Sequence, residues 1–216
     1  DLMWEQGFID ARKMAGTFRL LRSQDLIWSR LVQSYLIGKR EPINDLMAWN
    51  ADGTRLPYAM HSAYLRKLFL NNDLAEGRYR VEEQPIAISD IRAPIFSVGT
   101  IRDHVAPWRS AFKINLLTDT DVTFLLTSGG HNTGIISAPG HPKRSYQVST
   151  KSETEPYLDP DTWAQRAPKK EGSWWPAWVE WLVKESSGST EPPALGRPER
   201  GYVILDDAPG RYVLQR

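Results

Sequence analysis

Two short apolar runs, separated by a helical pattern, constrain the fold of this chain more than any other feature. Apolar and β-branched side chains fill both runs almost continuously, at residues 93–99 (APIFSVG) and 121–127 (DVTFLLT). Such runs are typical of strands inside a sheet, and we expect the first to be buried on both faces. Residues 107–117 between them predict a helix with a proline near its first turn. Together they predict a parallel strand-helix-strand unit with a right-handed crossover, and hence an α/β fold.

The rest of the chain predicts helices before this unit and loops after it. Apolar residues recur at three- and four-residue spacing over residues 12–37 and 57–71, which indicates helices. Short strands are expected within residues 77–88. Residues 139–171 are dense in Pro, Ser, Lys and Glu and predict loops, whereas residues 173–184 predict a short helix rich in tryptophan.

The composition argues against several classes of function. The 27 basic and 26 acidic side chains leave a net charge of +1, so there is no electrostatic case for binding nucleic acid. No run of about eighteen apolar residues occurs, so no transmembrane segment is expected. The chain has no cysteine, and no two histidines stand at a metal-ligand spacing, so neither disulfides nor a metal site are expected.

An acidic residue and a histidine follow the two apolar runs. Asp103 lies just past the first run, in TIRDHVAPW, and His131 lies just past the second, in TSGGHNTG. Because catalytic groups of open α/β sheets gather at the carboxyl ends of the strands, we expect both side chains at one edge of the sheet. An acid followed by a histidine is the order of the last two members of a hydrolase triad. The alternative is that Asp103 caps the next helix and His131 is a surface residue.

A nucleophile for such a triad is missing from the chain. It contains no cysteine and no Gly-x-Ser-x-Gly motif. The chain starts at Asp1 without the features of a secretory signal, which suggests a piece of a longer protein. Either the nucleophile precedes Asp1 in that protein, or the chain is not catalytic.

Several long motifs resemble the C-terminal half of class I polyhydroxyalkanoate synthases, also called poly-β-hydroxybutyrate polymerases. The resemblance extends over essentially the whole chain. The segments that carry it are MAGTFRLLRSQDLIW at 14–28, DLMAWNADGTRLPYAMHSAYLR at 45–66, DHVAPWRS at 103–110, SGGHNTGI at 128–135, GSWWPAWVEWL at 172–182 and APGRYV at 208–213.

This resemblance implies the C-terminal portion of an α/β-hydrolase fold with a helical cap. Residues 1–80 would form the cap, residues 81–138 the C-terminal part of the hydrolase core, and residues 139–216 an extension with the tryptophan-rich helix. Asp103 and His131 would be the acid and the base of a Cys-Asp-His triad. Its cysteine would lie in a Gly-x-Cys-x-Gly motif upstream of this chain.

The implied activity is an acyltransferase of polyhydroxyalkanoate synthesis. It would transfer 3-hydroxyacyl groups from coenzyme A to the cysteine sulfur and extend a polyester, with coenzyme A released as the leaving group and no resident cofactor. The intact protein would be a cytoplasmic homodimer at the surface of polyester granules. Without its nucleophile and its central strands, this chain alone is expected neither to fold stably nor to turn over substrate.

The resemblance also brings three further residues near the substrate, with a structural alternative for each. His104 follows the acid. It would either line the active site or only pack against neighbouring side chains. Trp49 and Asn50 would either lie along the substrate path in the cap or be structural, in the core of the cap and in a turn.

The tryptophan-rich helix is expected to dock on the hydrolase core. The alternative is that it forms an exposed adhesive patch.

Two other functions remain open at this point. One is a non-catalytic synthase-like subunit or granule-binding fragment that pairs with a nucleophile-bearing partner. The other is an esterase or depolymerase of the same fold. The segment AWNADGTRLP, at residues 48–57, argues against the second, because it resembles synthases specifically.

Overall fold

The computed structural model describes residues 3–21, 23–39, 42, 45–53, 55–208 and 210–211. The chain divides into two compact units. The first comprises Asp1–Arg92 with Leu117–Asp119, and the second comprises Ala93–Leu116 with Thr120–Arg216.

The first unit is mainly helical, as the three- and four-residue apolar spacing predicts. The Asp10 carboxylate accepts a hydrogen bond from the Lys13 N–H (2.8 Å) and so caps the first helix. The helical segments are α1 (Ala11–Leu21), η1 (Gln24–Trp28), α2 (Ser29–Leu31), η2 (Val32–Leu36), α3 (Asp45–Ala51), α4 (Tyr58–Ala63), η3 (Tyr64–Leu70) and the short η4 (Ile88–Asp90). These bounds confirm the helices predicted over residues 12–37 and 57–71.

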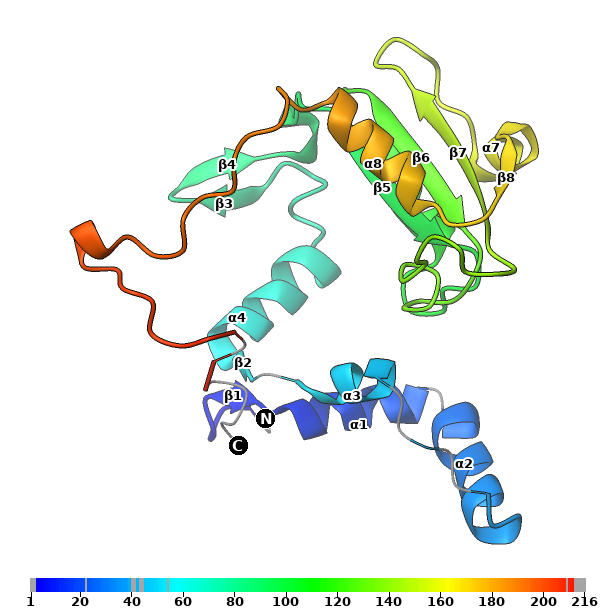
Figure 1. The fold of residues 1–216 in the computed structure, drawn as a ribbon, viewed down its shortest axis with the longest axis vertical. Helices are drawn as coiled ribbons and strands as arrows, with labels where there is room; N and C mark the ends of the chain where they lie inside the picture. Colours follow the sequence, from blue (N-terminus) through cyan, green and yellow to red (C-terminus); the bar gives the residue numbers. More distant parts are fainter. Residues whose placement is uncertain are drawn as a thin grey trace. The chain divides into compact units, whose positions relative to one another are not determined.

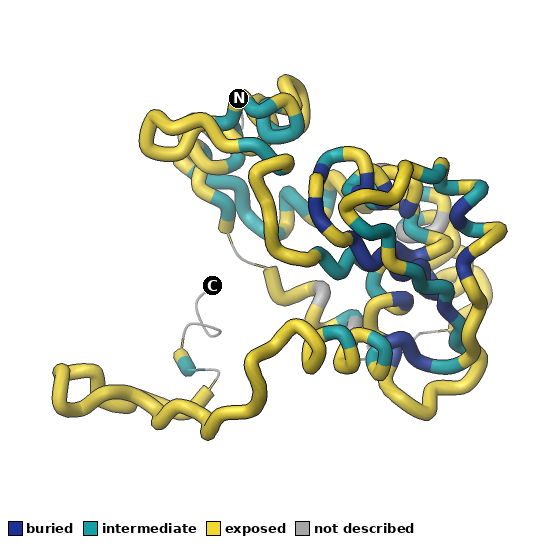
Figure 2. The backbone as a smooth tube through the Cα atoms, turned by 90° about the horizontal axis from the view of Figure 1, so that it is seen from above, coloured by how far each residue is buried: buried dark blue, intermediate teal, exposed yellow. Residues whose placement is uncertain are grey.

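Four short strands complete the first unit. They form two antiparallel pairs, β1 (Phe8–Ile9) with β2 (Leu56–Pro57) and β3 (Tyr79–Val81) with β4 (Gln84–Ile86). The second pair confirms the short strands predicted within residues 77–88. No described residue from 3 to 92 is buried, and Figure 2 shows the buried positions of the chain elsewhere. The apolar faces of these helices therefore lack a closed core within the part of the unit that is described.

The second unit is built on a four-stranded sheet in the order β5-β6-β7-β8 (Figure 1). β5 (Ile95–Thr100) and β6 (Val122–Thr127) are parallel and in register from one end to the other. β7 (Ser145–Lys151) is antiparallel to β6, and β8 (Lys169–Glu171) is antiparallel to β7. The fold is thus mixed α/β with a partly parallel sheet, and the two predicted parallel strands are confirmed.

The predicted burial of the first strand on both faces is wrong for most of its length. β6 is buried at every residue, whereas in β5 only Gly99 and Thr100 are buried. The cause is the position of β5 at the edge of the sheet, where β6 is its one strand neighbour among the described residues.

The single helix predicted over residues 107–117 is also wrong. The structure has two short helices, α5 (Trp108–Ala111) and α6 (Ile114–Leu117). The side-chain amide of Asn115 donates to the carbonyl oxygen of Phe112 (2.9 Å). Because this side chain competes for a backbone acceptor, the local pattern favours a turn over a continuous helix.

Residues 139–171, predicted as loops, contain regular elements. They include β7, α7 (Pro160–Arg166) and β8. Asp159 caps α7, since its carboxylate accepts hydrogen bonds from the N–H groups of Asp161 and Thr162, both at 3.0 Å. The proline at the first position of α7 and the polar residues of β7 give this stretch the composition of a loop, although Gln147 and Ser149 of β7 hydrogen-bond to α7.

Two apolar clusters cover the two faces of β6, because successive side chains of a strand point to opposite faces. Phe124 and Leu126 pack on one face with Trp108, Phe112, Trp163 and Ala167. Leu125 packs on the other face with Tyr146 and Trp174 and, around them, Phe96, Val98, Val148, Trp175 and Ala177. This two-sided core holds the strand ends from which the candidate site extends.

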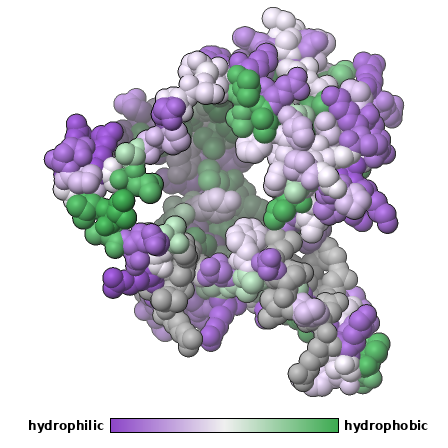
Figure 3. Space-filling model, in the orientation of Figure 1, coloured by the Kyte–Doolittle hydropathy of each residue, from purple (hydrophilic) through white to green (hydrophobic). Residues whose placement is uncertain are grey.

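Helix α8 (Trp175–Lys184) covers the second of these faces (Figure 1). Trp174, which precedes it, is only 5% exposed, and the ring of Trp181 lies 5.5 Å from that of Phe96 on β5. The predicted docking of this helix on the core is therefore confirmed. Its outer side leaves Val179 and Val183 exposed. Figure 3 shows apolar side chains at the surface of the molecule. Beyond it, residues 186–208 are exposed and include the short turn η5 (Pro198–Arg200). Among the described residues no helix combines the length and the apolar character needed to span a bilayer.

Candidate active site

The carboxyl ends of β5 and β6 bring two loops together. The two strands end at the same level, since Thr100 pairs with Thr127. Backbone hydrogen bonds between the two segments continue beyond the strands. The Ile101 N–H donates to the carbonyl oxygen of Thr127 (3.0 Å), and the Arg102 N–H donates to that of Gly129 (2.9 Å). The loop that follows β5 is thereby held against the loop that follows β6.

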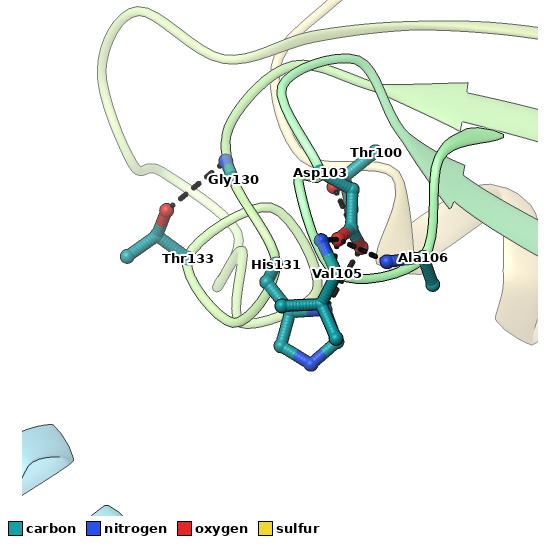
Figure 4. Close-up of polar contacts among 7 residues, drawn as sticks. All are labelled: Thr100, Asp103, Val105, Ala106, Gly130, His131 and Thr133. Atoms are coloured by element: carbon teal, nitrogen blue, oxygen red, sulfur yellow. Dashed lines mark hydrogen bonds and ion pairs between the residues drawn. The ribbon is translucent and has the colours of Figure 1, made fainter. Parts of the chain in front are cut away.

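Asp103 and His131 meet between these loops (Figure 4). The Nδ1 atom of His131 lies 3.0 Å from Oδ1 and 2.9 Å from Oδ2 of Asp103. The Asp103 carboxylate also accepts hydrogen bonds from the N–H groups of Val105 and Ala106, both at 2.8 Å. The aspartate side chain is 8% exposed, whereas the histidine side chain is 43% exposed. The pair therefore has a sheltered carboxylate and an accessible imidazole.

The environment of Asp103 favours its ionised form. Partial burial by itself would raise the pKa of Asp103, but it is outweighed by the hydrogen bonds from Ala106, His131 and Val105 and by the charge of His131, so the pKa is lowered. An ionised carboxylate only accepts hydrogen bonds, so Nδ1 of His131 must carry the hydrogen. Whenever the ring carries only this one hydrogen, its Nε2 atom is a proton acceptor.

Two glycines let the chain turn sharply around His131. Gly129 has φ +116°, a conformation that side chains other than glycine rarely adopt, and a β-carbon there would stand 2.7 Å from Gly134 Cα. A β-carbon on Gly134 would stand 2.6 Å from Thr100 Cγ2. The turn is closed by the Gly134 N–H, which donates to the carbonyl oxygen of Gly130 at 2.8 Å. The position of the imidazole thus depends on close backbone approach.

The arrangement can carry out general acid–base chemistry. The carboxylate fixes the orientation and tautomer of the imidazole, and Nε2 lies on the side of the ring that points away from the carboxylate in Figure 4. Such a ring can take a proton from a nucleophile that approaches from that side and return it to a leaving group. Among the described residues no group of three or more His, Cys, Asp or Glu could hold a metal ion.

The other residues predicted for the site are placed less specifically. His104 is exposed in the turn directly after Asp103. Trp49 is 63% exposed and lies in α3 of the first unit, as does the backbone of Asn50, whose side chain is outside the described part of the structure. Their roles near the substrate remain predictions.

Sequence reasoning missed a set of contacts to the His131 loop. Ser173, Trp174 and Trp175 hydrogen-bond to carbonyl oxygens between residues 134 and 137. The adjacent tryptophans at the start of α8 were the available signal, but their spacing predicts only a docked helix face.

Comparison with known proteins relates the chain to one kind of enzyme. No protein-family model matches it. It is 37% identical over 213 residues to poly(3-hydroxyalkanoate) polymerase 2 of Ectopseudomonas oleovorans, covering 99% of the chain and 37% of that protein. It is 36% identical over 211 residues to the poly(3-hydroxyalkanoate) polymerase of Methylorubrum extorquens, covering 98% of the chain and 34% of that protein. With the poly(3-hydroxyalkanoate) polymerase subunit PhaC of Cupriavidus necator it shares 34% identity over 202 residues, or 93% of the chain and 33% of that protein. The chain thus spans about a third of the length of these relatives.

Proposed function

We propose that the chain belongs to the poly(3-hydroxyalkanoate) polymerase family, to whose members it is similar over nearly its whole length, and that it supplies the acid and the base of a polymerase active site. The observation that carries the proposal is the contact of the His131 Nδ1 with both carboxylate oxygens of Asp103, at 3.0 and 2.9 Å. The nucleophile is a cysteine outside this chain, which itself contains none. The three groups form a Cys-Asp-His triad.

The reaction is acyl transfer from a 3-hydroxyacyl-coenzyme A thioester. His131 Nε2 takes the proton of the cysteine thiol, and the thiolate attacks the thioester carbonyl carbon. The bond to the coenzyme A sulfur breaks, and the departing thiolate takes the proton back from the imidazolium. The acyl group on the cysteine is then attacked by a hydroxyl oxygen of another 3-hydroxyacyl unit, whose proton passes to His131. The bond from the acyl carbon to the cysteine sulfur breaks as the ester bond forms, and the released thiolate takes the proton back from the imidazolium. Repetition of these steps extends the polyester.

The remaining parts of the chain fit an α/β-hydrolase framework. We place the four-stranded sheet at the carboxyl-terminal end of the hydrolase sheet. β5 has an open edge among the described residues, which a strand from the rest of the polymerase can occupy. We assign the helical segments from α1 to η3 to the cap subdomain of the polymerase. The intact protein is a class I enzyme that works as a homodimer at the surface of polyester granules in the cytoplasm.

The decisive experiment uses the complete polymerase that carries this chain. Translation of the upstream coding sequence should reveal a continuous frame with a Gly-x-Cys-x-Gly motif. Asp103→Asn and His131→Ala are then compared with the unaltered enzyme for coenzyme A release from 3-hydroxybutyryl-coenzyme A. Both variants should lose most of the rate while their circular dichroism spectra stay unchanged. An active His131→Ala enzyme would overturn the proposal.

The lack of cysteine also favours a second candidate, a synthase-like subunit that is not catalytic by itself and either pairs with a nucleophile-bearing partner or coats granules. A start codon directly before this chain, without an upstream cysteine motif in frame, would support it. In that case the chain should restore polymerisation only when mixed with a cysteine-bearing partner, and Asp103→Asn should abolish the restoration if the partner uses its acid and base.

A further inference from the structure

Two indole groups at the start of α8 hold the loop that carries His131. The indole N–H of Trp174 donates to the carbonyl oxygen of Gly134 at 3.1 Å. The indole N–H of Trp175 donates to the carbonyl oxygen of Ile135 at 2.9 Å. Two adjacent tryptophans thus bind two adjacent carbonyl groups, three and four residues after the histidine.

A third contact continues this pattern. The Ser173 hydroxyl donates to the carbonyl oxygen of Ser137 and accepts a hydrogen bond from the Trp175 N–H at 3.1 Å. Ser173 is 9% exposed and Ser137 is fully buried. Three consecutive residues therefore fix the downstream arm of the loop, and we call Ser173, Trp174 and Trp175 the loop clamp.

The opposite side of the same turn rests on the end of β5. Gly134 lies so close to Thr100 that a β-carbon would overlap its side chain, and the Gly134 N–H closes the turn onto the carbonyl oxygen of Gly130 (2.8 Å). The turn that presents His131 is thus held between β5, which leads to Asp103, and the loop clamp.

Burial makes these contacts costly to break. Trp174 is 5% exposed, so an outward shift of the loop would leave its indole N–H and the Gly134 carbonyl unpaired away from water. A loop held in this way has little freedom to move its imidazole away from the carboxylate. Positioning of this kind matters because a displacement of about 1 Å can cost a catalytic group about a hundredfold in rate.

We infer that Ser173, Trp174 and Trp175 are positioning residues, which act on catalysis by holding the His131 imidazole against Asp103. The effect that we expect on the reaction rate rests on the proposed function. The effect that we expect on the geometry of His131 and Asp103 does not. The tryptophan motif thereby gains a role beyond covering the sheet.

The test removes one indole donor at a time in the complete polymerase. Trp174→Phe and Trp175→Phe each delete a donor to the loop, and Trp163→Phe is the matched control. Trp163 is 6% exposed and donates its indole N–H to the Ser149 hydroxyl at 2.7 Å, in the cluster on the other face of β6. If Trp174→Phe does not fold, benzothienylalanine at position 174 keeps the shape of the side chain and removes only the donor.

Two measurements separate positioning from general stability. One is steady-state turnover with 3-hydroxybutyryl-coenzyme A. The other is the proton NMR signal of the His131 Nδ1–H in enzyme labelled with ¹⁵N-histidine, assigned by its absence from His131→Ala. We expect the clamp variants to lose or broaden this signal and to lower kcat by about 10- to 100-fold, with KM changed by less than about twofold. The Trp163 variant should keep the signal and a kcat within about twofold of the unaltered enzyme, whatever its melting temperature.

Each outcome bears on a different claim. An unchanged signal and kcat in both clamp variants would overturn the inference, as would an equal loss in the Trp163 control. Loss of the signal with unchanged kcat would support the clamp and count against the proposed function.

Discussion

Gly134 lies against the side chain of Thr100 so closely that a β-carbon at position 134 would stand 2.6 Å from Thr100 Cγ2 and 2.9 Å from the Gly130 carbonyl oxygen. The contact joins the end of β5 to the loop after β6.

Gly134→Ala should therefore destabilise the protein and displace His131. Overpacking at a backbone contact costs about 1–3 kcal/mol. Gly16→Ala is the control, because a β-carbon at this position in α1 meets nothing within 4 Å. The control should leave stability unchanged or raise it by up to about 1 kcal/mol, as alanine favours helix over glycine. Urea unfolding and coenzyme A release test both, and an alanine at 134 with normal activity would contradict the close approach.

The lowered pKa of Asp103 predicts a pH dependence of stability. A carboxyl whose pKa is depressed in the folded state contributes stability above its unfolded pKa, and this contribution is lost as the pH falls through the folded value. Asp103→Asn should thus lower the free energy of unfolding by about 1–3 kcal/mol near pH 6, and the difference should shrink below about pH 4. Urea unfolding of both proteins across this range measures it. If the difference in free energy of unfolding between the two proteins stays constant down to pH 2.5, the ionised carboxylate of Asp103 is not the source of the stabilisation.

Asp103→Asn should also separate two possible roles of the acid. In the proposed reaction, orientation of His131 would affect both formation of the acyl-enzyme and its extension, whereas activation of the substrate hydroxyl would affect extension alone. Rapid-quench measurement of acylation, followed by polymer growth from a primed enzyme, distinguishes them. We expect both steps to slow by about 10²- to 10⁴-fold, with extension affected more. Equal slowing would remove support for a separate role in extension.

Much of the fold and the central pair of the site could be predicted from the sequence, because both depend on local pattern and simple topology. The apolar runs at 93–99 and 121–127 define two strands, and parallel pairing brings Asp103 and His131 to one edge. The structure adds that the registers match end to end, which no local pattern encodes.

The missed features depend on single side chains or on distant contacts. The break between α5 and α6 follows from the Asn115 amide, which binds a neighbouring carbonyl. The helix α7 could not be predicted from its first residues, because Asp159, which caps it, and the proline that follows are also typical of loops. The bond from Trp174 to Gly134 joins residues 40 positions apart, so helical spacing alone could not indicate it.

The two units should differ sharply in stability when the chain is expressed alone. Buried apolar side chains of the described structure gather on the two faces of β6, whereas no described residue from 3 to 92 is buried. Since burial of apolar surface is the main stabilising contribution, residues 3–92 should exchange their amide hydrogens within seconds, and protection should concentrate in β6 and β7. Hydrogen exchange read by mass spectrometry tests this, with Phe124→Ala as a variant that should abolish the protection because it empties the core beside Trp163. A single cooperative melting transition of the isolated monomer, with equal protection in both units, would contradict the prediction and show that the helices of the first unit are stabilised within this chain.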